Sequence, residues 1–241
     1  MAADRKRPGS DAMDQHGFIA SVFEAAGGEH VDALVPAGYT GKRADILFRT
    51  DGIIAEIKSL TSDRRNDPKV GEKLGEMLAR DPEGPVIFGE VTIGLHDLPG
   101  HLAERALREV GDRVRKEVSS AGKQIEATRT ILDMPEAYGL LVFVSPPDRI
   151  GHQSIAWLVN DIVRQSADRC KLDGLLVMET ALGLGDPEGI NANSFSSVWS
   201  ISGRPLPENF GNHLGKAWEQ MTSQPARTAE VGTFTRLGSA E

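Results

Sequence analysis

The chain has 241 residues, with 27 Lys and Arg against 35 Asp and Glu, a formal net charge of −8 and a pI near 5.3. Its 39% hydrophobic residues are enough to bury a core without disulfides, which excludes disorder of the whole chain. The negative charge argues against a protein that coats nucleic acid or anionic membrane by bulk attraction, although it leaves room for a local basic groove.

The single cysteine, Cys170, excludes an intramolecular disulfide and a cysteine-based zinc cluster. The first 15 residues are polar, and no run of about 18 apolar residues occurs, so we expect a cytoplasmic protein that does not enter a membrane. One continuous globular pattern lies between two ends, residues 1–10 and 223–241, which we expect to be flexible.

Residues 11–26 carry apolar side chains at helical spacing, and a Gly-Gly pair ends the run, which predicts a helix. An extended piece is expected over 31–35. The β-rich runs 44–50 and 53–60 are joined by Asp51-Gly52, which predicts a hairpin with a two-residue turn.

Farther along the chain, helical and β-rich patterns alternate. Helices are expected over 70–79, 102–132, 154–167 and 208–221, and strands over 85–93, 138–144, 174–178 and 196–201. This order predicts an α/β protein with a mixed β-sheet that has helices on both faces.

The hairpin carries charge on one face only. A two-residue turn would place Asp45 opposite Lys58 and Leu47 opposite Glu56, and alternation would give the other face apolar residues alone. On the hairpin alone, an exposed Asp45–Lys58 ion pair and a functional cluster are equally supported. The flanking apolar residues favour two-sided burial, where charges persist if they pair, bind metal or do chemistry.

Asp45, ten intervening residues and then Glu56-Ile57-Lys58 at the end of a strand resemble the motif of the PD-(D/E)XK nuclease superfamily. The resemblance implies a restriction-endonuclease-like fold, with an α-β-β-β-α-β core over residues 11–145 and an α/β extension of the same domain over 146–222. Ala44 stands where the family often has proline.

The resemblance implies Mg²⁺-dependent hydrolysis of phosphodiester bonds, with Mn²⁺ as an alternative ion. Asp45, Glu56 and the carbonyl of Ile57 would ligate the metal, and Lys58 would act on the attacking water. Gln124, on the helix after the motif, matches a glutamine that several branches of the family use, and a half-exposed surface glutamine is an equally supported interpretation. Many members add an acid from the first helix, and the candidates here are Asp14, Glu24 and Glu29, with Glu24 expected on the polar surface.

Basic residues around the hairpin are candidates for phosphate contact. They are Lys42, Arg43, Arg64, Arg65, Lys123 and Arg129. Residues 38–130 hold 16 basic and 16 acidic side chains, so the excess acid lies outside this segment.

We therefore expect a nuclease that acts on DNA, in defence, restriction or repair, either as a homodimer or with a partner protein that guides it. The alternative is a non-catalytic binding or assembly module that keeps the fold.

Overall fold

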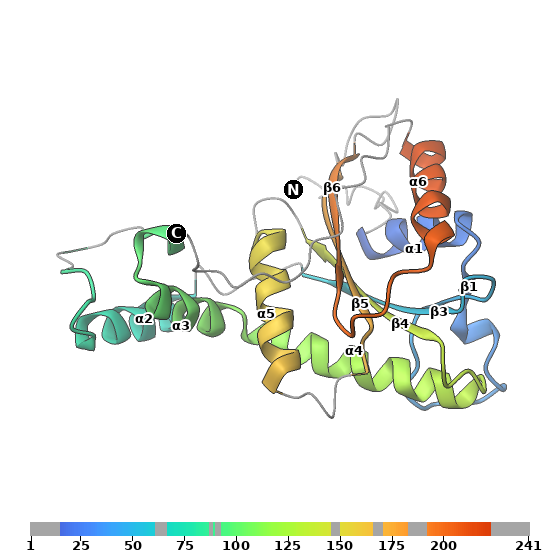
Figure 1. Ribbon diagram of the computed structural model, residues 1–241, viewed down its shortest axis with the longest axis horizontal. Coiled ribbons are helices and arrows are strands. Elements are labelled where there is room, and N and C mark those ends of the chain that lie inside the picture. Colours follow the sequence, from blue (N-terminus) through green and yellow to red (C-terminus); the bar gives the residue numbers. More distant parts are fainter. Residues whose placement is uncertain are drawn as a thin grey trace, which may run out of the picture.

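A computed structural model describes residues 15–60, 67–86, 89, 93–145, 150–165, 171–182 and 192–222. Within these residues the protein is α/β, with six α-helices and a six-stranded mixed sheet (Figure 1). Cys170 and the two ends that we expected to be flexible lie outside the described residues.

The sheet has the strand order β1-β2-β3-β4-β5-β6. The strands are β1 Glu29–His30, β2 Ile46–Phe48, β3 Ile53–Ser59, β4 Tyr138–Ser145, β5 Gly174–Leu182 and β6 Ala192–Ser200. The central strands β3, β4 and β5 run parallel, and β1, β2 and β6 are antiparallel to their neighbours. This arrangement confirms the predicted mixed sheet.

Helices cover both faces of the sheet (Figure 1). The helices are α1 Gln15–Ala25, α2 Pro68–Arg80, α3 Gly100–Val110, α4 Asp112–Ile131, α5 His152–Gln165 and α6 Glu208–Thr222. One core lies between the sheet and helices α4 and α5, and a second core lies between the sheet and helices α1 and α6. Residues of β4 and β5 alternate between these two cores, which is why both strands read as continuous apolar runs.

The hairpin register differs from the predicted one by two residues. Ile46 pairs with Ala55 and Phe48 with Ile53, so four residues, 49–52, form the turn. Gly52 has φ +64° and its N–H donates to the Arg49 carbonyl at 3.3 Å. A glycine in this left-handed conformation closes the longer turn. Because the shift is an even number of residues, each side chain keeps the predicted face.

The long helix predicted over 102–132 is two helices, α3 and α4, separated at Gly111. A Cβ atom on Gly111 would lie 2.4 Å from Leu158 Cδ1 of α5 and 2.9 Å from the carbonyl oxygen of Leu107. The close approach of α5 therefore requires glycine here, and the chain changes direction at the residue that tolerates it.

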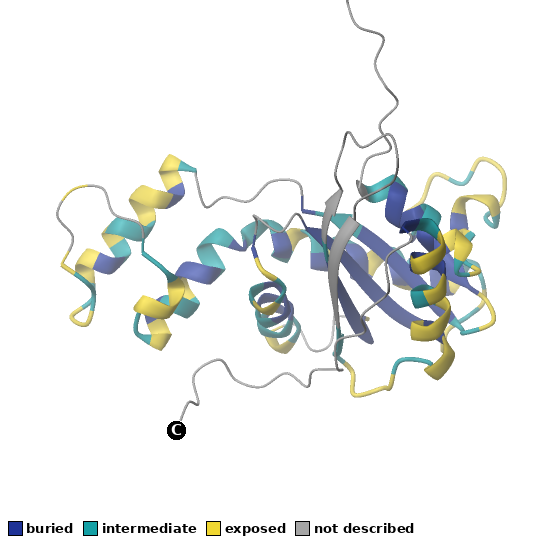
Figure 2. Cartoon of the chain, turned by 90° about the horizontal axis from the view of Figure 1, so that it is seen from above, coloured by how far each residue is buried: buried dark blue, intermediate teal, exposed yellow. Residues whose placement is uncertain are grey.

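Helices α2 and α3 form an arm that extends beyond the edge of the sheet (Figures 1 and 2). Most arm residues are exposed or half-buried, in contrast to the buried central strands (Figure 2). Asp67 caps α2 by accepting from the Lys69 N–H at 3.0 Å, and Pro68 occupies the first turn, where its missing N–H costs nothing.

Two other predictions need correction. The extended piece over 31–35 is a 3-10 helix, η1 Val31–Ala33, because the N–H groups of Leu34 and Val35 turn back to the Val31 carbonyl. A second 3-10 helix, η2 Leu95–Asp97, precedes α3. The strand expected over 85–93 falls mostly outside the described residues, and its described residues, 85, 86, 89 and 93, belong to no strand. Gly89, with φ +80°, is incompatible with extended backbone there.

Candidate active site

The charged residues of the hairpin face helix α4. The apolar residues of this sheet face, Leu47 and Ile54, lie in the core beneath α4 and α5, and alternation places Glu56 and Lys58 on the same face. One further step in the β2–β3 register brings Asp45 opposite Glu56. The predicted juxtaposition of Asp45 with Lys58 is therefore replaced by Asp45 with Glu56.

Glu56 is buried, and one of its two carboxyl oxygens has a contact partner in the described residues. Its side chain is 1% exposed, and Oε1 lies 2.6 Å from Lys58 Nζ. The other oxygen, Oε2, is buried and has no hydrogen-bond partner in the described part of the chain. Burial, and then the nearby charge of Asp45, raise the pKa of Glu56 to about 8, against the opposing effects of Lys58 and Gln124.

Lys58 and Gln124 are joined across the space between β3 and α4. Lys58 Nζ donates to Gln124 Oε1 at 3.0 Å, and the Ser120 hydroxyl donates to the same oxygen at 2.9 Å. Gln124 Nε2 donates to the Arg43 carbonyl at 3.0 Å, so both ends of the amide are fixed. The structure thus brings Gln124 to the candidate site, while its catalytic role stays a prediction.

Asp45 is half-buried and directly precedes Ile46, the first residue of β2. Asp45 Oδ2 accepts a hydrogen bond from the Ile57 N–H at 2.7 Å. This contact fixes the side chain beside Glu56 and occupies the N–H of Ile57, whose carbonyl is the group that the family resemblance assigns to the metal.

This cluster offers a metal ion two carboxylates, those of Asp45 and Glu56. Across the described residues, no group of three or more His, Cys, Asp or Glu side chains is gathered closely enough to hold a metal ion. Mg²⁺ commonly takes one or two protein carboxylates and completes its octahedron with water and substrate phosphate. The unpartnered, buried Oε2 of Glu56 next to Asp45 fits such a site, and it does not fit an ion that needs an all-protein shell.

The acids of the first helix do not extend the cluster in the described residues. Glu24 pairs with His30 at 2.7 Å and is about half exposed, as expected of a surface acid. It belongs to α1, which covers the opposite face of the sheet. Glu29 of β1 pairs with Arg49 at 3.1 Å, and Asp14 lies outside the described residues.

Five of the six basic candidates fall into three groups. Lys42 and Lys123 are exposed, and each is the chain neighbour of a residue in the Gln124–Arg43 contact. The Arg43 guanidinium pairs with Asp32, so only its carbonyl belongs to the cluster. Arg64 and Arg65 lie outside the described residues.

Arg129 is not a phosphate contact. It is 7% exposed, and its guanidinium donates to the Ala137 carbonyl at 3.0 and 2.7 Å, to the Lys171 carbonyl at 3.0 Å and to Asp173 at 2.8 Å. Arg129 therefore connects α4 to the segments that lead into β4 and β5.

Sequence reasoning missed Glu117 and Ser120. Both lie on the face of α4 that carries Gln124, Glu117 two turns and Ser120 one turn before it, and Glu117 Oε2 lies 3.9 Å from Lys58 Nζ. The signal in the sequence is the spacing of i−7 and i−4 from Gln124, which places polar residues on one helical face.

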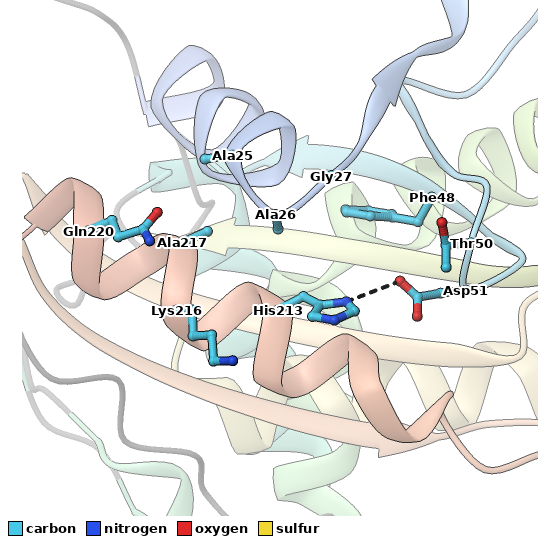
Figure 3. Close-up of a pocket in the computed structure, with 10 residues that line it drawn as sticks. All are labelled: Ala25, Ala26, Gly27, Phe48, Thr50, Asp51, His213, Lys216, Ala217 and Gln220. Carbon is cyan, nitrogen blue, oxygen red and sulfur yellow. Dashed lines mark ion pairs between the residues drawn. The ribbon is translucent and has the colours of Figure 1, made fainter.

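A separate pocket of about 400 Å³ lies on the other face of the molecule, between α1, α6 and the β2–β3 turn (Figure 3). Asp51 of the turn and His213 of α6 approach to 3.6 Å across it. This pair joins α6 to the β2–β3 turn on the face of the sheet opposite Glu56.

No family model, curated protein or solved structure matches this chain. Among the described residues, no helix is long and apolar enough to cross a membrane.

Proposed function

We propose that this chain is a Mg²⁺-dependent nuclease that hydrolyses phosphodiester bonds of DNA. The observation that carries the proposal is the buried Glu56, which keeps one oxygen without a partner while it stands beside Asp45 and Lys58. Such strongly perturbed carboxylates cluster at functional sites because burial alone is costly. The same residues carry the resemblance to the PD-(D/E)XK superfamily, and that fold assignment is part of the proposal.

In this proposal Asp45 and Glu56 hold the ion, and the Ile57 carbonyl completes the protein ligands. When bound, Mg²⁺ lowers the pKa of a water and stabilises the charge on the leaving oxygen. Oxygen ligands suit Mg²⁺ or Mn²⁺, whereas zinc usually takes histidine or cysteine.

Lys58 supplies the positive charge of the protein itself. Its ammonium group orients the attacking water and offsets the negative charge that builds on the phosphate. Gln124 holds the ammonium group at 3.0 Å and is itself held by Ser120 and the Arg43 carbonyl, so the lysine is positioned before substrate arrives.

Contacts to the DNA backbone are assigned to the exposed Lys42 and Lys123, which flank the Arg43–Gln124 contact. Arg64 and Arg65, just after β3 in sequence, complete this proposed set. Because the whole chain carries −8, non-specific attraction to DNA is weak, and a homodimer or a guiding partner would bring the site to its substrate.

The test is cleavage of supercoiled plasmid DNA by the full chain with Mg²⁺ or Mn²⁺, with chelator as the blank and single-stranded RNA as a second substrate. Asp45→Asn, Glu56→Gln and Lys58→Met should each lower cleavage by about 100-fold or more while the melting transition remains cooperative. Glu72→Gln, an equal charge change on the exposed side of α2, is the matched control and should cut like wild type.

Undiminished cleavage by the three site variants would show that another site or a contaminant is responsible. A wild-type chain that neither cuts nor binds divalent cation, yet forms a stable protein complex, would favour the non-catalytic binding module instead.

A further inference from the structure

We infer that Glu117 of helix α4 is a positioning residue that holds the ammonium group of Lys58 so that Glu56 can bind a divalent cation. This inference rests on the proposed function. Lys58 Nζ lies 2.6 Å from Glu56 Oε1 and 3.9 Å from Glu117 Oε2, so the lysine stands between carboxylates from two different elements.

The placement of Glu117 is set by the helix rather than by a chance surface contact. Arg113, Glu117, Ser120 and Gln124 recur at steps of three and four, which aligns them along one face of α4. Glu117 is 28% exposed, and its Oε1 lies 3.9 Å from Arg113 Nε, while Oε2 points to Lys58. The carboxylate is therefore attracted by two cations, one nearest each oxygen.

Lys58 has three N–H donors and two close acceptors, Glu56 and Gln124. Glu117, at 3.9 Å, is beyond hydrogen-bond distance but close enough for strong charge attraction in a partly buried site. The ammonium group is thus balanced by a second negative charge, which comes from a different element than Glu56.

That second charge matters because an ammonium group and a divalent cation compete for the same carboxylate. With Glu117 present, Lys58 can loosen its contact with Glu56 and remain neutralised. Among the described contacts of Lys58, removal of Glu117 leaves Glu56 as the one nearby carboxylate. A divalent cation that binds Glu56 must then displace or repel the Lys58 ammonium group. We expect Glu117→Gln to weaken cation binding by about tenfold.

The experiment measures Mn²⁺ and Mg²⁺ binding to the full chain by titration calorimetry, without DNA. The proteins are wild type, Glu117→Gln, Lys58→Met and the double variant, which form a double-mutant cycle. Glu126→Gln removes one charge from the same helix at a residue that pairs with Arg129, and it serves as the matched control. Glu117→Asp keeps the charge and should bind within about threefold of wild type, and melting curves report folding.

A tenfold loss in Glu117→Gln that shrinks to less than about twofold in the Lys58→Met background, with Glu126→Gln unchanged, supports a role through Lys58. An equal loss in both backgrounds would mean that Glu117 acts on the cation directly, and wild-type affinity in Glu117→Gln would mean that Glu117 has no role. Either result overturns this inference but leaves the proposed function standing. A wild type that binds no cation overturns the proposed function, and the inference with it. If Glu117→Gln fails to fold, Glu117→Ala is measured in its place against the same criteria.

Discussion

Replacing Glu56 with glutamine should stabilise the protein at neutral pH while it abolishes the proposed chemistry. Glu56 is 1% exposed, and its pKa is raised from 4.5 to about 8, mainly by burial. The folded state therefore holds a proton on this carboxyl that the unfolded chain releases near pH 4.5. Stability is complete below that pH and is lost as the pH rises toward about 8.

The size of the effect follows from the two pKa values. Each pH unit between them costs the folded state about 1.4 kcal/mol, so the wild-type protein has lost about 3 kcal/mol at pH 7 and about 1 kcal/mol at pH 5. Glutamine has nearly the shape of a protonated glutamate and its carbonyl can still accept from Lys58. The variant should thus be more stable by about 3 kcal/mol at pH 7, or about 6–12 °C in melting temperature for a chain of this size.

The assay is thermal and urea unfolding of wild type and Glu56→Gln from pH 5 to pH 8.5, without divalent ions. The difference in unfolding free energy should grow with pH and level off near pH 8. Glu72→Gln, an exposed position on α2, should show no such trend. A Glu56→Gln protein that is less stable than wild type at pH 7, or a difference that does not depend on pH, would refute the assignment of a costly buried carboxyl.

Three further variants probe the same structure. Asp45→Asn should lose cation binding in calorimetry but melt within about 1 kcal/mol of wild type, because its side-chain oxygen still accepts from Ile57, and loss of fold would contradict this. Arg129→Met should lower the unfolding free energy by about 3–5 kcal/mol in urea titrations, while the salt dependence of DNA binding is unchanged. Gly111→Ala should cost about 1–3 kcal/mol, and a second change, Leu158→Ala, should recover part of it if the Cβ clash is the cause.

The elements that could be predicted from the sequence are those whose signal is local. Residues 208–221 and 70–79 carry a strong helical period and correspond to α6 and α2, and the apolar run 138–144 is confirmed as β4. The break at Gly111 was not predicted, because the apolar period continues through it and the close approach of Leu158, 47 residues later in the chain, is a tertiary contact. Local periodicity runs through the break without interruption.

In the candidate site, too, the local features could be predicted and the tertiary contacts could not. The face shared by Asp45, Glu56 and Lys58 was predicted correctly although the register was not, because a shift of two residues preserves the alternation of a strand. The partners of these residues were not predictable. Whether Lys58 meets Asp45 or Glu117 depends on the turn length and on how α4 is rotated against β3, and both are set by packing.

Arg129 and Glu56, two buried ionisable groups, differ in how fully their polar atoms are hydrogen-bonded, and this difference supports the proposed position of the chemistry. Arg129 donates to two carbonyls and to Asp173, so its charge is used inside the fold. Glu56 is also buried, yet Oε2 has no donor among the described residues, and burial raises the pKa of the group. A buried ion pair adds little stability compared with apolar packing, so stability does not explain why Glu56 and Lys58 are there. An added cation at Oε2 would satisfy the unmet oxygen and lower the pKa of Glu56, so cation binding would release the Glu56 proton and tighten as the pH rises toward about 8.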